Sequence, residues 1–391
     1  MTLADRWLLP EGVDEALPKK AAQIEHLRRA LLNLHESWGY RLVIPPLLEY
    51  LDSLLTGAGS DLEIETFKVI DQLSGRLLGI RADFTSQVSR IDAHCLKGEG
   101  VQRLSYCGSV LRTMPAGLDG TRSPIQLGAE LYGHGGIESD IEVLSLMLET
   151  LNVAGLNNLV LDLGHVDVVR GVLDACNLSK DQEARLTEFY KSKDLPELDA
   201  YVAELDVTKE QAGWLVLLPR LCGGVDVLDR ATAGLSGVGA SVLDAIALLG
   251  EVSALISRRY PAVGLHFDLS DLVSYSYHTG LLFAAYVPGH GNAIARGGRY
   301  NNIGEVFGRS RPATGFSTDV KALVALVDFE VATPKTVLAP ICASDAMWQA
   351  VKALRSEGYR VIEALDDAWA GRVDFVLKFA GDAWQLVPAE K

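Results

Sequence analysis

Residues 106–130, YCGSVLRTMPAGLDGTRSPIQLGAE, contain two apolar runs on either side of a loop rich in proline and glycine. The first run ends at Arg112, and the second, 125–130, ends at Glu130. The pattern predicts two antiparallel strands, with Gln126 and Glu130 on one face because side chains alternate along a strand. A hairpin that carries an arginine and an acid on a shared face could bind a small zwitterion. An ordinary surface hairpin with a solvated polar face is the simpler interpretation of the pattern alone.

The composition is that of a globular chain with room for more than one domain. The chain has 391 residues, 48% of them hydrophobic, and its mean hydropathy is close to zero. No apolar run approaches the ~20 residues that span a bilayer, and the first residues, MTLADRWLLPEG, do not resemble a signal peptide. The net charge of −15 and the lack of a Lys/Arg cluster argue against a nucleic-acid surface.

The five cysteines are scattered along the chain, and no pair has the CxxC spacing typical of zinc sites. Free thiols in a reducing compartment are therefore expected, rather than disulfides or a metal site. We expect a cytoplasmic protein without a metal, a cofactor, a nucleic-acid partner or a membrane partner.

Periodicity predicts a mixed α and β chain. Helical spacing of apolar residues marks 19–40 and 138–151, and Gly39 is placed to end the first helix. A strand interrupted by two prolines is expected at 40–48. Further predictions are a hairpin in 66–81, strands at 158–163, 264–269 and 273–286, and a strand–helix–strand–strand–strand order in 334–391. We expect a main domain of 1–328 with a helical insertion at about 174–256, and a small C-terminal α/β domain of 329–391.

The central hairpin resembles motif 2 of class II aminoacyl-tRNA synthetases, most closely that of histidyl-tRNA synthetases. Leu111-Arg112-Thr113-Met114 and Ile125-Gln126-Leu127-Gly128-Ala129-Glu130 carry this resemblance. The helix and proline-containing strand at 19–48 resemble motif 1, the dimer-forming element, and 312–323 resembles motif 3, a strand that leads into a helix. The resemblance implies an α+β fold of class II synthetase type, with an antiparallel sheet flanked by helices.

Three other segments resemble the parts of that family that bind histidine. In Arg81-Ala82-Asp83-Phe84-Thr85, the resemblance places Asp83 and Thr85 at the α-amino group, and Asp83 could also cap the helix that begins near Thr85. Tyr277-His278-Thr279-Gly280 and Gly297-Gly298-Arg299-Tyr300 resemble the segments around the ligand side chain. The histidine site implied by the resemblance consists of Asp83, Thr85, Arg112, Gln126, Glu130, Tyr277, His278 and Tyr300.

The resemblance also implies a role for several of these residues. Glu130 would accept a hydrogen bond from the imidazole of the ligand. Asp83, Thr85 and Gln126 would contact its ammonium group. Arg112 would lie near the ligand carboxylate or, as in the synthetases, face ATP.

The charged groups with which the synthetases handle ATP are missing from the corresponding positions. Met114 replaces a glutamate, Val273 replaces the catalytic arginine, and Ala322 replaces the arginine of motif 3. Lys321 precedes Ala322, but a helical step of about 100° points its side chain elsewhere. A site that keeps the amino-acid-binding groups and loses the ATP-binding charges predicts a sensor without catalytic residues.

This pattern is similar to the regulatory subunits of short-form ATP phosphoribosyltransferase, as is the segment Trp7-Leu8-Leu9-Pro10-Glu11-Gly12. Members of that family are non-catalytic and join a short catalytic subunit, which condenses ATP with phosphoribosyl pyrophosphate in the first step of histidine biosynthesis. The resemblance implies activation of that subunit, feedback inhibition by L-histidine, and self-association through a class II-type dimer. Two alternatives stay open: a divergent but active histidyl-tRNA synthetase, and a non-catalytic scaffold with a vestigial pocket.

Overall fold

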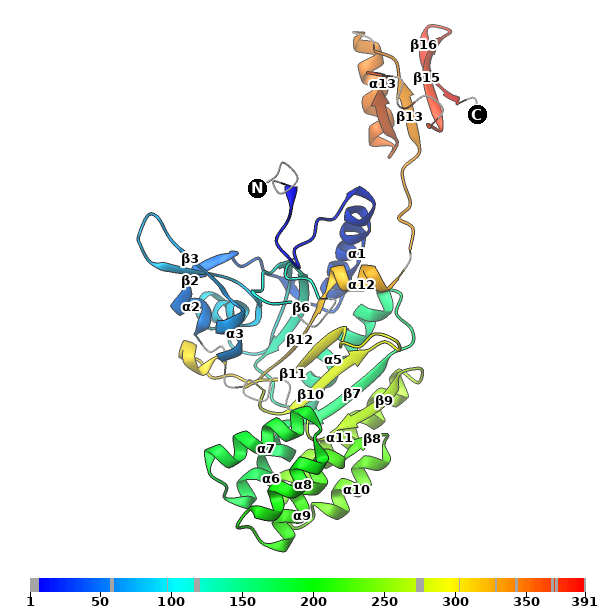
Figure 1. The fold of residues 1–391 in the computed structure, drawn as a ribbon. Helices are drawn as coiled ribbons and strands as arrows, with labels where there is room; N and C mark the ends of the chain where they lie inside the picture. The colour runs from blue at the N-terminus through cyan, green and yellow to red at the C-terminus, as the bar shows by residue number, and fades with distance from the viewer. Residues whose placement is uncertain are drawn as a thin grey trace. The chain divides into compact units, whose positions relative to one another are not determined.

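The computed structural model describes residues 7–56, 60–96, 98–115, 120–271, 278–301, 303–327, 329–341, 344–366, 369 and 372–389 (Figure 1). The chain divides into two compact units, Met1–Asp328 and Phe329–Lys391. The first unit holds the large sheet and most of the helices, and the second is a small sheet with one helix.

A nine-stranded sheet forms the centre of the first unit, in the order β1-β5-β6-β12-β11-β10-β7-β9-β8. The strands are β1 Arg41–Leu42, β5 Gln102–Ser109, β6 Ile125–Tyr132, β7 Val160–His165, β8 Cys222–Gly223, β9 Gly264–Asp268, β10 Leu281–Tyr286, β11 Ala295–Arg299 and β12 Ala313–Asp319. The middle pairs are antiparallel as predicted, but β1–β5 and β7–β9 are parallel. Parallel neighbours need a long crossover, and the helices between β7 and β9 supply one.

Three helices pack against the central strands: α1 Pro18–Ser37, α5 Ile137–Val153 and α12 Val320–Leu326. α5 contacts β6, β11 and β12, and α1 contacts both α5 and α12. Apolar residues at helical spacing bury one side of α1, including Ile24, Leu27 and Leu31, while Pro18 occupies its first turn, where no amide hydrogen is needed. The strand–helix pair β12–α12 confirms the order predicted for 312–323.

The first unit also contains a smaller sheet with the strand order β2-β4-β3. Its strands are β2 Leu48–Tyr50, β3 Phe67–Ile70 and β4 Leu77–Ile80, and the short helices α2 Leu51–Leu55 and α3 Ser60–Glu65 join β2 to β3. The β3–β4 pair is the hairpin predicted in 66–81. α4 Thr85–Arg90 follows β4 and continues as a π-helix, Ile91–Leu96. Hydrogen bonds from Gln126 connect the turn between β4 and α4 to β6.

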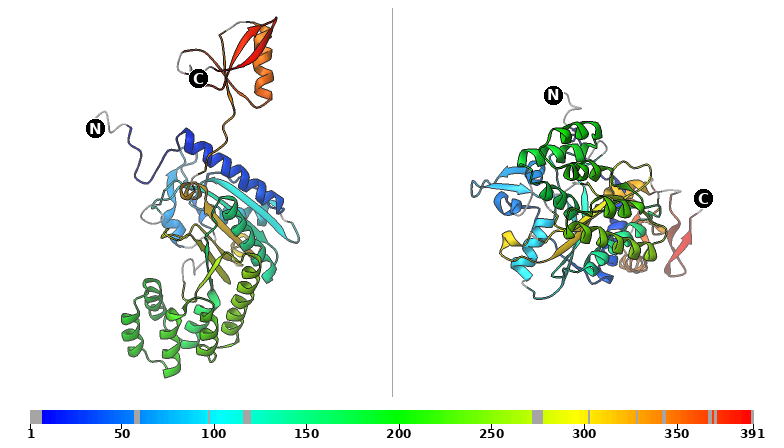
Figure 2. Two further views of the ribbon diagram at one scale, coloured as in Figure 1. Left: turned by 90° about the vertical axis from the view of Figure 1, so that its right-hand side faces the viewer. Right: turned by 90° about the horizontal axis from the view of Figure 1, so that it is seen from below.

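The predicted helical insertion forms a lobe at the β7 end of the sheet, drawn in green in Figures 1 and 2. It contains α6 Val166–Cys176, α7 Lys180–Ser192, α8 Leu195–Glu204, α9 Lys209–Leu217, a 3₁₀ turn Leu218–Arg220, α10 Asp226–Gly234 and α11 Ala240–Arg259. Ser179 and Gln182 form a capping box at the start of α7. The insertion also contributes the short strand β8, which the sequence pattern did not predict.

One described helix, α11, is long and apolar enough to cross a membrane by length and composition, although we expected no such segment. α11 contacts α5, α6, α10 and β7, and its buried residues include Val242, Leu249 and Ile256. It therefore packs as a core helix of the lobe in this structure.

The C-terminal unit has the order predicted from its sequence. Its strands β13 Thr336–Ala339, β14 Arg360–Glu363, β15 Phe375–Ala380 and β16 Ala383–Pro388 form a sheet in the order β14-β13-β15-β16. The helix α13, Asp345–Ser356, buries Met347 and Val351 against Val337 and Leu377 of the sheet.

Two strand predictions were wrong in their boundaries. The region 40–48 forms only the two-residue strand β1, because Pro45 and Pro46 lack the amide hydrogens that a ladder needs. The first strand of the central hairpin is β5, which ends at Ser109, so Arg112 lies beyond the strand, where it makes an isolated bridge with Thr66. The predicted placement of Arg112 on a hairpin strand opposite Glu130 is therefore wrong.

Candidate functional site

A cavity of about 330 Å³ lies over the middle strands of the large sheet. The β4–α4 turn borders it on one side. Residues of α3, β5, β6, β7, β9, β10, β11 and β12, and of the loops next to them, supply the remaining walls. The predicted site residues that line it are Asp83, Thr85, Arg112, Glu130, His278 and Tyr300. Gln126 does not line the cavity, and Tyr277 falls outside the described residues.

Glu130, on β6, is the most deeply buried acid of the cavity, with 2% of its surface exposed. The hydroxyl of Tyr106 donates to Oε1 at 3.0 Å, that of Tyr300 donates to Oε2, and Thr85 Oγ1 lies 3.5 Å from Oε1. Burial raises the pKa of Glu130 to about 8, the nearby charge of Asp83 acts in the same direction, and the hydroxyl hydrogen bonds oppose both. The carboxyl group is therefore largely protonated at neutral pH when the cavity holds no cation.

Glycines on the sheet leave room for the side chains of Glu130 and Tyr106. A Cβ at Gly315, on the neighbouring strand β12, would overlap the carboxylate of Glu130, and one at Gly128 would overlap the hydroxyl of Tyr106. Gly315 pairs with Glu130 across the ladder, so the acid lies flat over the adjacent strand. Glycine is required here by close approach, not by its backbone angles.

Asp83 lies in the turn between β4 and α4, and two amides hold its carboxylate. Oδ1 accepts from the backbone of Thr85 at 2.7 Å, and Oδ2 accepts from Nε2 of Gln126 at 2.6 Å. The oxygen of the same Gln126 side chain accepts from the backbone of Phe84 at 3.2 Å. Gln126 thus fixes the turn to β6. Asp83 accepts from the first amide of the helix that begins at Thr85, although the N-cap residue of that helix is Phe84, and it also lines the cavity.

Aromatic side chains, among them Tyr106, His278 and Tyr300, also line the cavity. The ring of His278 meets that of Tyr300 edge to face, with centroids 6.5 Å apart, and lies against Gly298, where a Cβ would be 2.7 Å from the imidazole. Phe84 and Tyr106 stack with centroids 4.6 Å apart. These contacts leave a slot with aromatic edges that suits a flat ligand group.

Arg112 lines the cavity from the loop after β5. Its Nε lies 3.4 Å from the backbone oxygen of Ala82 and 3.8 Å from the carboxylate of Glu65, which also lines the cavity. The guanidinium is therefore at the edge of the cavity, next to the β4–α4 turn, although it is not on a hairpin strand.

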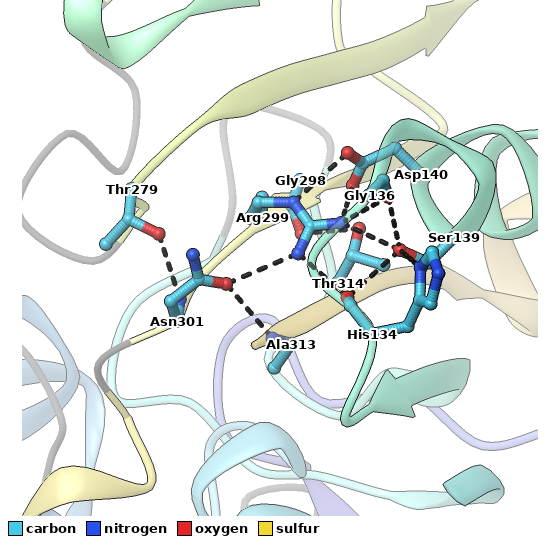
Figure 3. A network of polar contacts seen from close by, with 10 residues as sticks. All are labelled: His134, Gly136, Ser139, Asp140, Thr279, Gly298, Arg299, Asn301, Ala313 and Thr314. Carbon is cyan, nitrogen blue, oxygen red and sulfur yellow. Dashed lines mark hydrogen bonds and ion pairs between the residues drawn. The ribbon is translucent and has the colours of Figure 1, made fainter. Parts of the chain in front are cut away.

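Arg299, which precedes Tyr300 in the chain, lies in the network of polar contacts drawn in Figure 3. Its guanidinium pairs with Asp140 of α5 at 3.0 Å and donates to Ser139 Oγ at 2.8 Å. It also donates to the backbone oxygens of His134 and Gly136 and to the side-chain oxygen of Asn301. The backbone N–H of Asn301 in turn donates to the hydroxyl of Thr279. The pairing of Arg299 with Asp140 was not predicted, because nothing in the local sequence indicates that two charges 159 positions apart form a buried pair.

The cavity is also lined by four charged residues that were not predicted to belong to the site: Asp162, Asp268, Asp271 and Arg296. β7 and β9 bring the first two together by parallel pairing across the helical lobe. The sequence does contain a signal for Asp162, because it stands between two leucines in Leu161-Asp162-Leu163. A charged residue within a buried strand is costly unless it has a partner, so its presence indicates a site.

The positions that lost charges relative to the synthetases do not line the cavity where they are described. Met114 is 65% exposed, and Ala322 lies on α12. Lys321 Nζ bonds to Asp14 at 3.0 Å and to Ser123 at 3.3 Å, so it does not take the place of the missing arginine. Val273 falls outside the described residues, and within them no group of three His, Cys, Asp or Glu is placed to hold a metal ion.

Comparison with known families gives one consistent result. Residues 12–323 match the family model described as histidyl-tRNA synthetase, and residues 334–387 match the one described as ATP phosphoribosyltransferase subunit HisZ C-terminal domain. The second match identifies the small C-terminal unit with a regulatory subunit and not with a synthetase.

Whole-chain relatives agree with both matches. The ATP phosphoribosyltransferase regulatory subunit of Marinomonas sp. (strain MWYL1) is 78% identical over 389 residues, which is 99% of each chain. That of Thioalkalivibrio sulfidiphilus (strain HL-EbGR7) is 52% identical over 366 residues, 93% of each. A solved structure titled ATP phosphoribosyltransferase regulatory subunit/histidyl-tRNA synthetase, from Bacillus halodurans, superposes with a TM-score of 0.81 at 26% identity, covering 93% of this chain and 94% of that one. The chain therefore belongs to the ATP phosphoribosyltransferase regulatory subunits, which have the class II fold of histidyl-tRNA synthetases and leave catalysis to a partner subunit.

Proposed function

We propose that the cavity over the large sheet binds L-histidine and that this binding regulates the catalytic subunit of the complex. The observation that carries the proposal is the buried carboxyl of Glu130, held between two tyrosine hydroxyls inside a slot with aromatic edges. A second carboxylate, Asp83, lines the same cavity. Together they match a ligand with two basic nitrogens and a flat ring.

The proton on Glu130 favours an imidazole over other rings. The pKa of Glu130 is about 8, so the carboxyl group carries a proton at neutral pH that an entering imidazole can accept. The resulting imidazolium donates an N–H to the carboxylate, a charge-assisted hydrogen bond of the stronger kind. A phenol or an indole ring cannot accept this proton, so tyrosine and tryptophan are poor ligands by this reasoning.

Asp83 and Thr85 supply the complementary site for the ammonium group. Two amides already hold Asp83 in place, and a carboxylate with about four lone-pair sites keeps two of them for the ligand. In this assignment Gln126 orients Asp83 and does not itself contact the ammonium. Arg112 is the cation placed for the ligand carboxylate, and His278 and Tyr300 flank the imidazole. We assign no contact to Tyr277, which stays a prediction from the resemblance.

Regulation requires that histidine bind differently to two states of the complex. A ligand with equal affinity for both states shifts neither, and typical coupling corresponds to about 5- to 150-fold in affinity. The β4–α4 turn is the natural element to differ, because Asp83 and Thr85 line the cavity from a segment outside the large sheet. We propose that histidine stabilises the position of this turn in the inhibited complex.

The test measures histidine twice, as a ligand of this chain and as an inhibitor of the complex. Calorimetric titration of the isolated chain with L-histidine is compared for the wild type, Glu130→Gln and Asp83→Asn. Phosphoribosyl-ATP formation is then followed with the short-form catalytic subunit across a histidine series. We expect both variants to weaken binding by at least about tenfold, the loss of one charged hydrogen bond, and to raise the inhibitory concentration equally.

Matched variants on the surface separate this effect from a general change of charge. Glu188→Gln on α7 and Asp226→Asn on α10 remove the same groups at exposed positions and should leave binding and inhibition unchanged. Inhibition that persists unaltered in Glu130→Gln, while the variant still activates the catalytic subunit, would place the histidine site elsewhere.

Self-association and location complete the proposal. Leu42, Ile44, Leu47 and Leu48, in and after the edge strand β1, are exposed, and we propose that they form the class II-type dimer contact. The described cysteines Cys95, Cys107, Cys176 and Cys222 are free thiols, which supports a cytoplasmic location.

A further inference from the structure

The β7-β9-β8 end of the sheet places a thiol, an imidazole and a carboxylate on three adjacent strands. Cys222 is on β8, His266 on β9 and Asp162 on β7. Asp162 is the direct ladder partner of His266, and Cys222 is that of Asp268, two residues further along the same face of β9. The register therefore brings the three side chains into one row.

The row has the order of a nucleophile, its base and a residue that orients the base. Sγ of Cys222 lies 3.5 Å from Nε2 of His266, and Nδ1 of His266 lies 2.9 Å from Oδ1 of Asp162. An ionised carboxylate can only accept a hydrogen bond, so the network assigns the ring proton to Nδ1. Nε2 is then left as the acceptor that faces the sulfur.

We propose that Cys222 is a nucleophilic thiol that reacts with soft electrophiles, hydrogen peroxide among them, with His266 as its base and Asp162 as the positioning residue. The thiol is exposed, and so an electrophile can reach it from solvent. Asp162 and Asp268 also line the cavity described above, whereas Cys222 itself does not.

The base is necessary because the surroundings of Cys222 disfavour a free thiolate. Burial and the carboxylates of Asp268 and Asp162 raise the pKa of the Cys222 thiol, and Lys193 and Arg230 only partly oppose them. Lys193 is itself paired with Asp268 at 2.7 Å. A thiol in this setting without proton transfer to His266 would react more slowly than an ordinary exposed cysteine.

The reaction with peroxide balances without further partners. The sulfur attacks the nearer oxygen, the S–O bond forms and the O–O bond breaks, and the thiol proton passes through His266 to the leaving hydroxide, which departs as water. The sulfur is oxidised to a sulfenic acid and the peroxide is reduced. With iodoacetamide as the probe, an S–C bond forms, iodide leaves with the bonding pair, and the proton remains on His266.

The experiment is alkylation of the full chain by iodoacetamide, with each cysteine followed by peptide mass spectrometry from pH 6 to 9. Cys95, an exposed thiol in the π-helix, is the internal reference, and buried Cys176 reports any unfolding. At pH 7 we expect Cys222 to react at least about tenfold faster than Cys95, a modest share of what a positioned base supplies. His266→Gln should lower the Cys222 rate below that of Cys95 while Cys176 stays protected.

Two further arms test the positioning residue and the oxidant. In Asp162→Asn the amide donates to Nδ1 and moves the ring proton to Nε2, so the Cys222 rate should fall although the shape of the row is kept. Peroxide treatment followed by dimedone should trap the sulfenic acid at Cys222 in the wild type and much less in His266→Gln. A Cys222 rate at or below that of Cys95 in the wild type, or one that His266→Gln leaves unchanged, would overturn the proposal.

Discussion

Replacing Glu130 by glutamine should remove a loss of stability that the wild-type protein suffers as the pH rises. Burial raises the pKa of Glu130 from 4.5 to about 8 in the folded chain. Glutamine has nearly the same shape, and it can accept from one tyrosine hydroxyl through its oxygen and donate to the other through its amide nitrogen, but it does not titrate. The two proteins therefore differ chiefly in the proton that Glu130 can bind and release and that glutamine cannot.

The sign and size of the effect follow from proton binding by the two states. Above about pH 5.5 the carboxyl group of Glu130 is ionised in the unfolded chain, and below about pH 7 it is still protonated in the folded chain. The folded state binds one more proton over this window, so its stability is fully present below pH 4.5 and is lost as the pH rises towards 8. One proton corresponds to about 1.4 kcal/mol per pH unit, or about 2 kcal/mol between pH 5.5 and 7.0.

Urea unfolding followed by far-ultraviolet circular dichroism measures this difference. The free energy of unfolding of Glu130→Gln minus that of the wild type should increase by about 2 kcal/mol from pH 5.5 to 7.0. Other titrating groups are common to both proteins and cancel in the difference. Glu188→Gln, at an exposed position of α7, should follow the wild type throughout. A difference between Glu130→Gln and the wild type that is constant with pH would refute the reasoning.

Three further predictions concern packing, the cavity and association. Arg299→Met leaves the buried carboxylate of Asp140 unpaired and should lower the free energy of unfolding by about 3–5 kcal/mol, most of which Arg299→Met/Asp140→Leu should restore; no recovery would contradict the pairing. Gly315→Ala places a Cβ on the carboxylate of Glu130 and should abolish histidine binding in calorimetry, whereas Gly291→Ala, which meets no atom within 4 Å, should bind normally. Ile44→Asp puts a charge on a side chain that is 82% exposed and should yield monomers by light scattering without loss of stability; persistent dimers would exclude this segment as the contact.

Local pattern was sufficient for elements whose apolar residues follow one period. Helices α1 and α5, the β3–β4 hairpin and the whole C-terminal unit lie within a few residues of their predicted positions. Strand β5 was not predicted at its observed position, because the polar residues in QRLSYCGS conceal the alternation of buried and exposed residues. The more apolar run that follows β5 was predicted to be the strand instead. Arg112 was misplaced as a consequence, although it still lines the cavity.

The resemblance predicted several residues that share one cavity, whereas contacts that depend only on the pairing of distant strands were not predicted. Asp83, Thr85, Glu130, His278 and Tyr300 all line one cavity. The bond from Gln126 to Asp83 joins β6 to a turn 43 positions earlier, and neither segment contains a signal for it. Asp162, His266 and Cys222 become neighbours only because β7 pairs with β9 across the helical lobe and β8 returns from within it. Such contacts are properties of the assembled sheet.

The glycines under the cavity tie its shape to the backbone of the sheet. Gly128, Gly297, Gly298 and Gly315 lie on β6, β11 and β12, and a Cβ at any of them would meet Tyr106, Phe283, His278 or Glu130. The same Cβ would also lie 2.3–2.9 Å from a backbone oxygen of a neighbouring strand, so an added methyl group would push strands apart as well as move a side chain. Single substitutions in this floor are therefore costly, and relatives that recognise ligands of another size would more readily change the side chains that border the cavity.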